Sequence, residues 1–198
     1  MTRALLPFRR AGLEQLSDEA LIANCADDNS ALEELFRRHG DRVHRVLARL
    51  AHVERHDLDD LVQATFVAVK RSTSRFDARS AVATWIVGIA LNVARHAVRG
   101  QVRQRLAMEA VAETHAASDS RGPEERASHR QLLSRLQDAI DALPPDLRTV
   151  FTLCDLEGLR GVEVARVLKL PQGTVWRRLH DARVRLRKLV EGEGEGGT

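Results

Sequence analysis

The segment from Gln172 to Arg183 carries side chains whose types and spacing suit the reading of DNA bases. Arginine and glutamine can contact base edges in the major groove, and a threonine near a helix start can hold a phosphate. At helical spacing the polar residues of this segment share the face opposite its apolar residues. That polar face holds Gln172, Thr174, Trp176, Arg177, His180, Asp181 and Arg183. We therefore predict a nucleic-acid-binding helix.

A helix-turn-helix is the element that would position these side chains. The turn is predicted at Lys169-Leu170-Pro171, because a proline suits the first residues of a helix, where its missing N–H is not needed. Lys169 stands where such turns often have glycine, since the backbone there is left-handed. The predicted inward residues are Val164, Ala165 and Leu168 in the first helix, and Val175, Leu179, Ala182, Leu186 and Leu189 in the second. The alternative is an ordinary helical hairpin with a basic solvent face.

A second basic segment lies in the middle of the chain. Residues 92–105 contain four arginines and no acid. Three of them repeat every four residues and would form one stripe along a helix, suited to phosphates; a solvated helix face is the alternative. They are Arg95, Arg99 and Arg103. Two separate basic segments predict two places where a polyanion can bind.

The composition favours helices over sheet. Of the 198 residues, 43% are hydrophobic but only 4% are aromatic, and there is no tyrosine. We predict an all-α protein with two small helical domains joined by a flexible linker, the second domain containing the helix-turn-helix. The predicted ranges are a flexible leader at 1–16, a first domain at 17–105, a linker at 106–128, a second domain at 129–190 and a disordered tail at 191–198.

Within the first domain, helical periodicity predicts four helices. Ser17 is the expected cap of the first. The second would bury Leu32, Leu35, Phe36, Val43, Val46, Leu47 and Leu50, and expose Arg37, Arg38, Arg42, Arg45 and Arg49. Asp57, Asp59 and Asp60 would occupy the first turn of the third, where the helix dipole favours acids. A loop at 72–80 would precede a long helix at 81–105 with a stripe of Val82, Ile86, Ile89 and Val93.

In the second domain, two further helices are predicted before the helix-turn-helix. The first carries Leu132, Leu133, Leu136, Ile140 and Leu143 and ends at Pro144-Pro145. The next carries Leu147, Val150, Phe151 and Leu153 and ends near Gly158.

Several classes of protein are disfavoured by what the sequence lacks. Cys25 and Cys154 have no CxxC context and are expected to be reduced thiols. Neither a signal peptide nor an apolar run of about 18 residues is found, so we expect a cytoplasmic protein without membrane insertion. His52 and His56 could bind a metal with Asp59 or Asp60, but surface histidines are the simpler interpretation. We predict no metal, no cofactor and no enzymatic activity.

Three segments near the end of the chain resemble the last domain of the extracytoplasmic-function (ECF) sigma factors of bacterial RNA polymerase. In chain order they are Ala142-Leu-Pro-Pro-Asp-Leu-Arg, Asp155-Leu-Glu-Gly-Leu and Pro171-Gln-Gly-Thr-Val-Trp-Arg-Arg-Leu. Earlier in the chain, Asp59-Asp-Leu-Val-Gln-Ala-Thr-Phe is similar to the family's polymerase-clamp segment. Three further segments resemble the promoter-melting segment of the same family. They are Arg75-Phe-Asp-Ala-Arg-Ser, Thr84-Trp-Ile and Ile89-Ala-Leu-Asn. The resemblance covers residues 17 to 190, approximately.

The resemblance implies a role for each segment. Residues docking on the β′ clamp would be Asp57, Asp59, Asp60 and Gln63. Residues at the −10 element would be Phe76, Asp77, Arg79, Ser80, Trp85, Asn92, Arg95, Arg99 and Arg103. The polar face of 172–183 would read the −35 element. The implied partners are core RNA polymerase, through its β′ clamp and β flap, promoter DNA and an anti-sigma factor.

Two departures from the family and one rival function remain open. Trp176 and Asp181 stand where relatives often carry basic residues, which leaves the preferred −35 sequence undefined. Ala64 replaces a frequent acid in the clamp segment. The rival is a helix-turn-helix regulator that acts without recruiting polymerase; it would leave the segments at 59–66 and 76–92 without a function.

Overall fold

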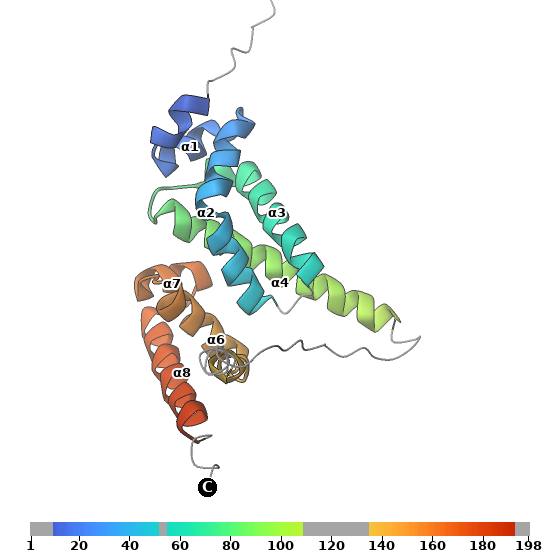
Figure 1. Cartoon of the computed structure of the whole chain (residues 1–198), viewed down its shortest axis with the longest axis vertical. Helices are drawn as coiled ribbons and strands as arrows, with labels where there is room; N and C mark the ends of the chain where they lie inside the picture. Colours follow the sequence, from blue (N-terminus) through green and yellow to red (C-terminus); the bar gives the residue numbers. More distant parts are fainter. Residues whose placement is uncertain (1–9, 52–54, 109–134, 193–198) are drawn as a thin grey trace, which may run out of the picture. The chain divides into compact units, whose positions relative to one another are not determined.

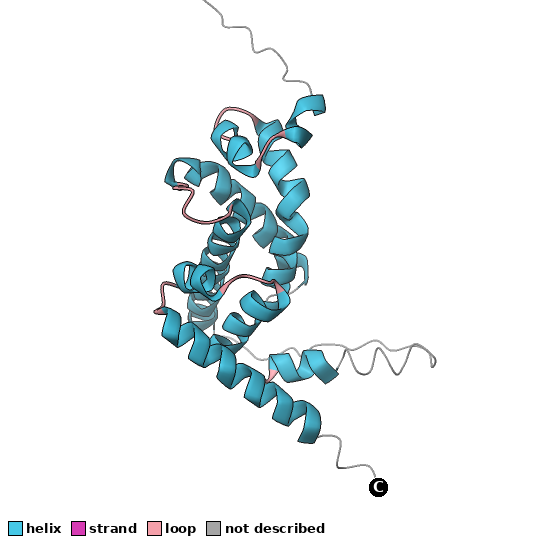
Figure 2. Ribbon diagram, turned by 90° about the vertical axis from the view of Figure 1, so that its left-hand side faces the viewer, coloured by secondary structure: helices cyan, strands magenta, loops and turns pink. Residues whose placement is uncertain are grey.

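The computed structural model describes residues 10–51, 55–108 and 135–192, which fall into two compact units that divide between Arg95 and His96 (Figure 1). Every regular element in these ranges is helical and none is a strand (Figure 2). The all-α prediction is therefore confirmed. Most of the predicted linker, the leader up to residue 9 and the tail from residue 193 lie outside the described residues, as do Leu132, Leu133 and His52.

The first unit is built from helices that pack in succession along the chain. Its elements are η1 (Arg10–Gln15), α1 (Asp18–Asn24), α2 (Asn29–Leu50), α3 (Arg55–Ser72), η2 (Thr73–Arg75) and the first part of α4 (Val82–Met108). Helix α2 packs against both α1 and α3. The Ser17 hydroxyl accepts a hydrogen bond from the Ala20 N–H at 3.2 Å, so the predicted cap of α1 is confirmed.

Two boundaries differ from the predicted ones. Helix α3 begins at Arg55, which leaves only Asp57 in its first turn. Asp59 and Asp60 lie further along the helix, so the helix dipole does not explain them. The segment predicted as a loop at 72–80 begins with the last residue of α3 and the 3₁₀ turn η2. Only residues 76–81 are non-helical there.

The buried face of α4 is displaced from the predicted stripe. Ile89 and Val93 are half-buried, although the spacing of large apolar residues placed them inside. The buried apolar residues described in α4 are Val82, Ile86, Val87, Ala90, Leu91 and Ala94. Two alanines lie on this face, and small side chains allow neighbouring helices to approach closely. A pattern built on large residues alone misses such a face.

Arg38 was predicted on the exposed side of α2, and this prediction is wrong. Its guanidinium donates hydrogen bonds to Asp18 at 2.8 Å and to Glu34 at 2.7 Å. The other donors reach the backbone carbonyls of Leu13, Glu14 and Leu16. All five N–H groups of an arginine are satisfied in this way. Arg38 therefore ties η1 and the start of α1 to α2.

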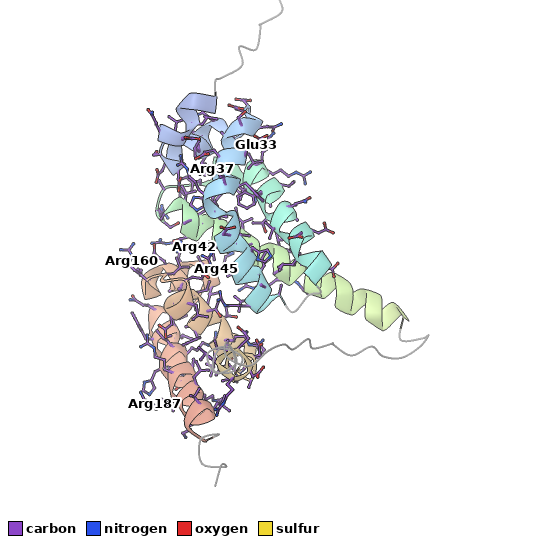
Figure 3. All side chains as sticks on the ribbon, in the orientation of Figure 1. Glu33, Arg37, Arg42, Arg45, Arg160 and Arg187 are labelled. Carbon is purple, nitrogen blue, oxygen red and sulfur yellow. The ribbon has the colours of Figure 1, made fainter. Side chains whose placement is uncertain are left out.

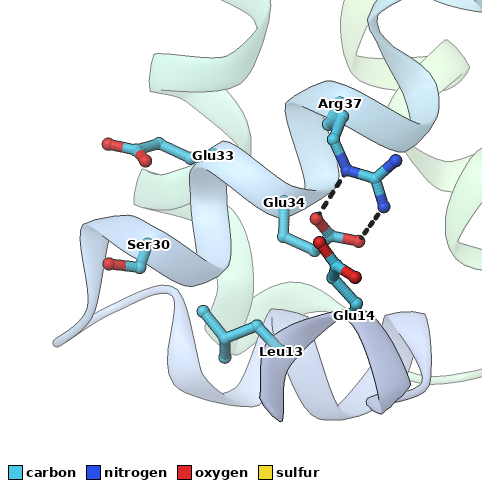
Figure 4. Close-up of a pocket in the computed structure, with 6 residues that line it drawn as sticks. All are labelled: Leu13, Glu14, Ser30, Glu33, Glu34 and Arg37. Carbon is cyan, nitrogen blue, oxygen red and sulfur yellow. Dashed lines mark hydrogen bonds and ion pairs between the residues drawn. The ribbon is translucent and has the colours of Figure 1, made fainter. Parts of the chain in front are cut away.

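A hollow of about 350 Å³ lies between η1 and α2, next to this network (Figure 4). Glu34 at its edge accepts two hydrogen bonds from Arg37, at 2.7 and 2.8 Å. The Glu34 side chain is only 8% exposed. The hydrogen bonds from Arg37 and Arg38 lower the pKa of Glu34 from 4.5 to about 2, against the opposing effect of desolvation.

This shift predicts acid sensitivity of the first unit. A depressed carboxyl pKa contributes stability above the unfolded value of 4.5, and that contribution is lost as the pH falls toward about 2. Glu34→Gln should therefore lower the melting temperature at pH 6. Below pH 4.5 the melting temperature of this variant should decrease less steeply with falling pH than that of the wild type. Thermal unfolding of the full chain between pH 6 and pH 2 measures this. Glu19→Gln, at an exposed position of α1, is the matched control and should leave the profile unchanged.

The second unit brings five helical elements around one small core. A helical segment at 135–141 precedes α6 (Pro145–Phe151), the π-helical turn η3 (Thr152–Leu156), α7 (Gly161–Leu168) and α8 (Gln172–Gly192). Helix α8 packs against α6 and α7. One buried cluster consists of Ala139, Ile140, Leu143, Leu147, Ala182 and Leu186, with Phe151 against it. Gly158, with φ of +69°, follows η3 and permits the left-handed turn toward α7.

Two leucines predicted inside this unit are exposed. Leu136 is 40% exposed and Leu189 is 36% exposed. Leu189 lies in the last turn of α8, beyond Leu186 at the edge of the core. The periodicity of α8 thus continues past the residues that cover it.

The turn between α7 and α8 has the expected left-handed residue. Lys169 has φ 56° and ψ 44°, and the Leu170 N–H donates to the Ala165 carbonyl at 2.9 Å. Because a side chain is unfavourable in this conformation, Lys169→Gly should stabilise the unit by about 0.5–1 kcal/mol. Urea unfolding of the full chain measures the gain in the free energy of unfolding. Hydrogen exchange of the amides of α7 and α8 shows that the gain lies in this unit. Lys169→Ala keeps the strain while removing the charge, so an equal gain in that variant would contradict the explanation.

Candidate nucleic-acid interface

Helix α8 exposes most of the residues predicted to read DNA. Its buried side carries Val175, Leu179, Ala182 and Leu186. On the other side Gln172, Trp176, Arg177, His180 and Asp181 are exposed, while Thr174 is half-buried. The helix carries further basic residues toward its C-terminus, Arg187 among them (Figure 3). Structure and sequence therefore agree on a polar outer face.

Ion pairs divide the arginines of α8 into two groups. Arg183 binds both oxygens of Asp155, at 2.6 and 2.8 Å, and Arg178 binds Asp146 at 3.1 Å. The hydrogen bonds that Arg183 donates to Asp155 raise the pKa of Arg183 above its usual value. Arg177, in contrast, forms no ion pair with any described side chain. Arg183, predicted to contact DNA, thus joins α8 to η3.

Trp176 is held against the start of α7 even though it is 50% exposed. A Cβ built on Gly161 would come within 2.8 Å of the indole Cζ2 atom and 3.0 Å of Cε2. The indole ring therefore packs directly against the Gly161 backbone, where no larger residue fits without displacing it. This contact and the two ion pairs fix how α8 is rotated about its axis.

Arg148 supports the same unit from inside. Its guanidinium donates to the backbone carbonyls of Asp141 and Leu143, the latter at 3.0 Å, and its side chain is only 7% exposed. These carbonyls end the helical segment at 135–141, where no intrahelical donor remains. Arg148 is the last residue of the segment 142–148, and its role was not predicted from the sequence. A basic residue three positions after the helix-ending Pro144-Pro145 pair was the available signal.

In the first unit, the loop before α4 has a constrained backbone. Ala78 has φ of +55°, a conformation that non-glycine residues rarely adopt. Asp77 accepts a hydrogen bond from the Arg79 N–H at 3.1 Å and lies 3.4 Å from the Arg79 guanidinium. Asp77 and Arg79, both predicted to meet DNA, thus shape the loop that carries them, and both are exposed.

Two aromatic rings connect this loop to α4. Phe76 and Trp85 lie 5.2 Å apart between ring centroids with planes tilted by 60°. Both are half-buried, as large aromatic side chains that anchor a core often are. Further along α4, Asn92, Arg95 and Arg99 are exposed. The side chain of Arg103 lies outside the described residues.

Helix α3 presents the residues predicted to bind polymerase. Asp59, Asp60 and Gln63 are exposed, whereas Asp57 is half-buried. Val67 follows Gln63 by one helical turn and is 47% exposed, so it lies on the same face. Val67 was not predicted from the sequence, where the available signal was an apolar residue outside the spacing of Phe66 and Val69.

The cysteines are free, and no metal cluster is found among the described residues. Burial raises the pKa of Cys25 and of Cys154 to about 11. Such thiols are poor nucleophiles near neutral pH. Among the described helices, none is long and apolar enough to cross a membrane.

The fold and the exposed face of α8 define a helix-turn-helix DNA-binding protein. Comparison with known proteins assigns both units. Residues 35–104 match the family Sigma-70 region 2, and residues 133–186 match Sigma-70, region 4. The chain is 34% identical over 200 residues to the ECF RNA polymerase sigma factor SigE of Mycolicibacterium smegmatis, covering 93% of this chain and 76% of that protein. It is 33% identical to the ECF RNA polymerase sigma-E factor of Haemophilus influenzae, covering 90% of this chain and 97% of that protein.

Solved structures agree with this assignment. The structure of CnrH in complex with the cytosolic domain of CnrY is similar with a TM-score of 0.64 and 27% identity, over 88% of this chain and 97% of that chain. The sigma factor RpoE from Bartonella quintana, solved with the anti-sigma factor NepR, has the same fold with a TM-score of 0.64 at 19% identity, over 80% of this chain and 96% of that chain. The chain belongs to the ECF family of RNA polymerase sigma factors. Its function is promoter-directed initiation of transcription, and members of this family are initiation factors without enzymatic activity.

Proposed function

We propose that three surfaces divide the work of this sigma factor. The first is the exposed face of α3, formed by Asp59, Asp60, Gln63 and Val67, which docks on the clamp helices of the β′ subunit. Exposed acids beside an exposed valine suit a basic partner surface with an apolar centre. Asp57, half-buried at the start of α3, supports the helix end on the same surface.

The second surface engages the −10 element. The constrained loop of Phe76, Asp77, Arg79 and Ser80 holds a base that has left the stack, as pockets for unstacked bases require edge donors and aromatic walls. Trp85 contributes its ring to the wall. Asn92, Arg95, Arg99 and Arg103 follow the strand along α4, with the arginines at the phosphates.

The third surface reads the −35 element. One observation about helix α8 supports this assignment and carries the whole proposal. A rigidly held α8 exposes Arg177 and its neighbours on the face away from the core. Helix-turn-helix proteins insert this part of the second helix in the major groove. The other residues of α8 assigned to this surface are Gln172, Thr174, Trp176, His180 and Asp181, whereas Arg183 acts by positioning the helix.

We extend the proposal to the partners and the domain ranges. The first domain spans 17–105 and the second 129–190, joined by a linker at 106–128, and the second domain also meets the β flap. RpoE from Bartonella quintana, a structural relative, was solved with the anti-sigma factor NepR. We propose that an anti-sigma factor likewise holds this chain. The site of action is the cytoplasm, where polymerase and promoter meet, and the chain itself catalyses no reaction.

The proposal predicts that tight DNA binding requires polymerase. The full chain alone should bind promoter duplexes weakly, and the same duplexes should be bound tightly once bacterial core polymerase is added. Electrophoretic mobility shifts on fragmented genomic DNA, with and without core enzyme, measure this. Tight, specific binding by the chain alone, with no effect of the core enzyme, would support a regulator that acts without recruiting polymerase.

A further inference from the structure

Asp181 is an isolated acid on a basic helix. Between Pro171 and Val190 there are five arginines and one lysine, and Asp181 is the single acid. It is exposed, and no hydrogen bond or ion pair joins its side chain to any described residue. Arg178 and Arg183, which lie nearby in sequence, are bound to Asp146 and Asp155 instead. The fold of the second unit therefore makes no use of the Asp181 carboxylate.

The position of Asp181 places it beside Arg177 on the outer face of α8. Residues four apart occupy the same side of a helix, about 6 Å apart along its axis. Consecutive base pairs are separated by about 3.4 Å. Arg177 and Asp181 can therefore reach base pairs that are at most two steps apart. The contact of Trp176 with Gly161 holds α8 against the start of α7 and so helps to fix which side of the helix carries this pair.

The two side chains have opposite hydrogen-bonding character. Arginine donates to guanine O6 and N7, whereas a carboxylate accepts from the N4 amino group of cytosine. A carboxylate near the phosphate backbone is repelled, so Asp181 is compatible with bound DNA only where it finds a donor. Within the major groove, cytosine offers that donor without the adjacent N7 acceptor that adenine presents.

We propose that Asp181 is a specificity-determining residue of the −35 contact and selects a cytosine within two base-pair steps of the base read by Arg177. The proposal rests on the proposed function, because it requires α8 to lie in the major groove. It supplies a reason for an acid at this position and defines part of the preferred −35 sequence, which the family resemblance left open.

The test uses the full chain with bacterial core polymerase. Transcripts from fragmented genomic DNA first identify a strong promoter, and its −35 region is then randomised and sequenced after transcription. For the wild type we expect cytosine at one position, enriched about 5- to 150-fold over other bases. Asp181→Asn should shift that position to adenine, since asparagine binds adenine N6 and N7. Asp181→Ala should lose the preference there and keep it elsewhere.

Each other outcome has a definite meaning. The inference is wrong if both variants keep the wild-type base preference. It is also wrong if both variants increase transcription by the same factor from every −35 sequence, because the acid then only repels phosphates. If transcription depends on core enzyme but the wild type shows no −35 preference, α8 does not read this element. That part of the proposed function is then wrong, and the inference about Asp181 is wrong with it. Asp138→Asn, at an exposed acid of the same unit outside α8, is the control and should match the wild type.

Discussion

Arg177→Ala should reduce transcription from the cognate promoter by about 5- to 150-fold, the range expected for the loss of one bidentate contact to guanine. Arg177 is exposed on the outer face of α8 and forms no ion pair with any residue that the structure describes. Arg177→Lys should lose nearly as much, because lysine keeps the charge but lacks the planar fork that binds two acceptors. Transcription from the native promoter and from one mutated in the −35 element measures both variants.

A control on the same helix separates base reading from charge. Arg185 is exposed on α8 more than two helical turns beyond Arg177, away from the N-terminal part of the helix that helix-turn-helix proteins place in the groove. Arg185→Ala should weaken binding similarly on native and mutated −35 sequences, as expected for a phosphate contact. If Arg177→Ala also acts equally on both sequences, then Arg177 contacts phosphate and does not read a base.

Arg148→Ala should destabilise the second unit by about 2–4 kcal/mol, which is a large fraction of the stability of a small domain. The change leaves two carbonyls at the end of the 135–141 helix without their donor and opens a cavity where a buried side chain was. Hydrogen exchange on the full chain measures the effect, because amides of α6 and α8 should exchange faster while those of α2 and α3 do not change.

Arg148→Met distinguishes the two contributions to this loss. Methionine restores most of the volume and none of the hydrogen bonds. We expect it to recover the packing contribution while the helix end still frays. Exchange rates in α6 and α8 equal to the wild type in both variants would contradict a structural role for Arg148.

The elements of the second unit could be predicted from sequence because their signals are local. Pro171 and the apolar spacing of 175–186 located α8, and the left-handed Lys169 followed from its place in the turn. The exposed polar face of α8 followed from the same periodicity. Leu189 was misplaced because periodicity shows which side a residue faces but not where the core ends.

The charged side chains could not be assigned in this way. Arg38 and Arg183 both lie on helices with many arginines, and nothing local distinguishes Arg183 from Arg177. Their partners, Asp18 and Asp155, are 20 and 28 residues away in the chain. Only the folded arrangement shows which arginines are bound by their own domain and which remain for a ligand.

The face of α3 is where the central claim is tested most directly. Multi-round transcription with core polymerase should compare the wild type with Asp60→Arg, and with Glu19→Arg as the matched charge reversal at an exposed position of α1. We predict discrete, core-dependent transcripts with the wild type and with Glu19→Arg, and a loss of all of them with Asp60→Arg while the fold is retained by circular dichroism. Equal transcription by all three proteins would contradict docking through α3, and no core-dependent transcript from the wild type would contradict the assigned activity itself.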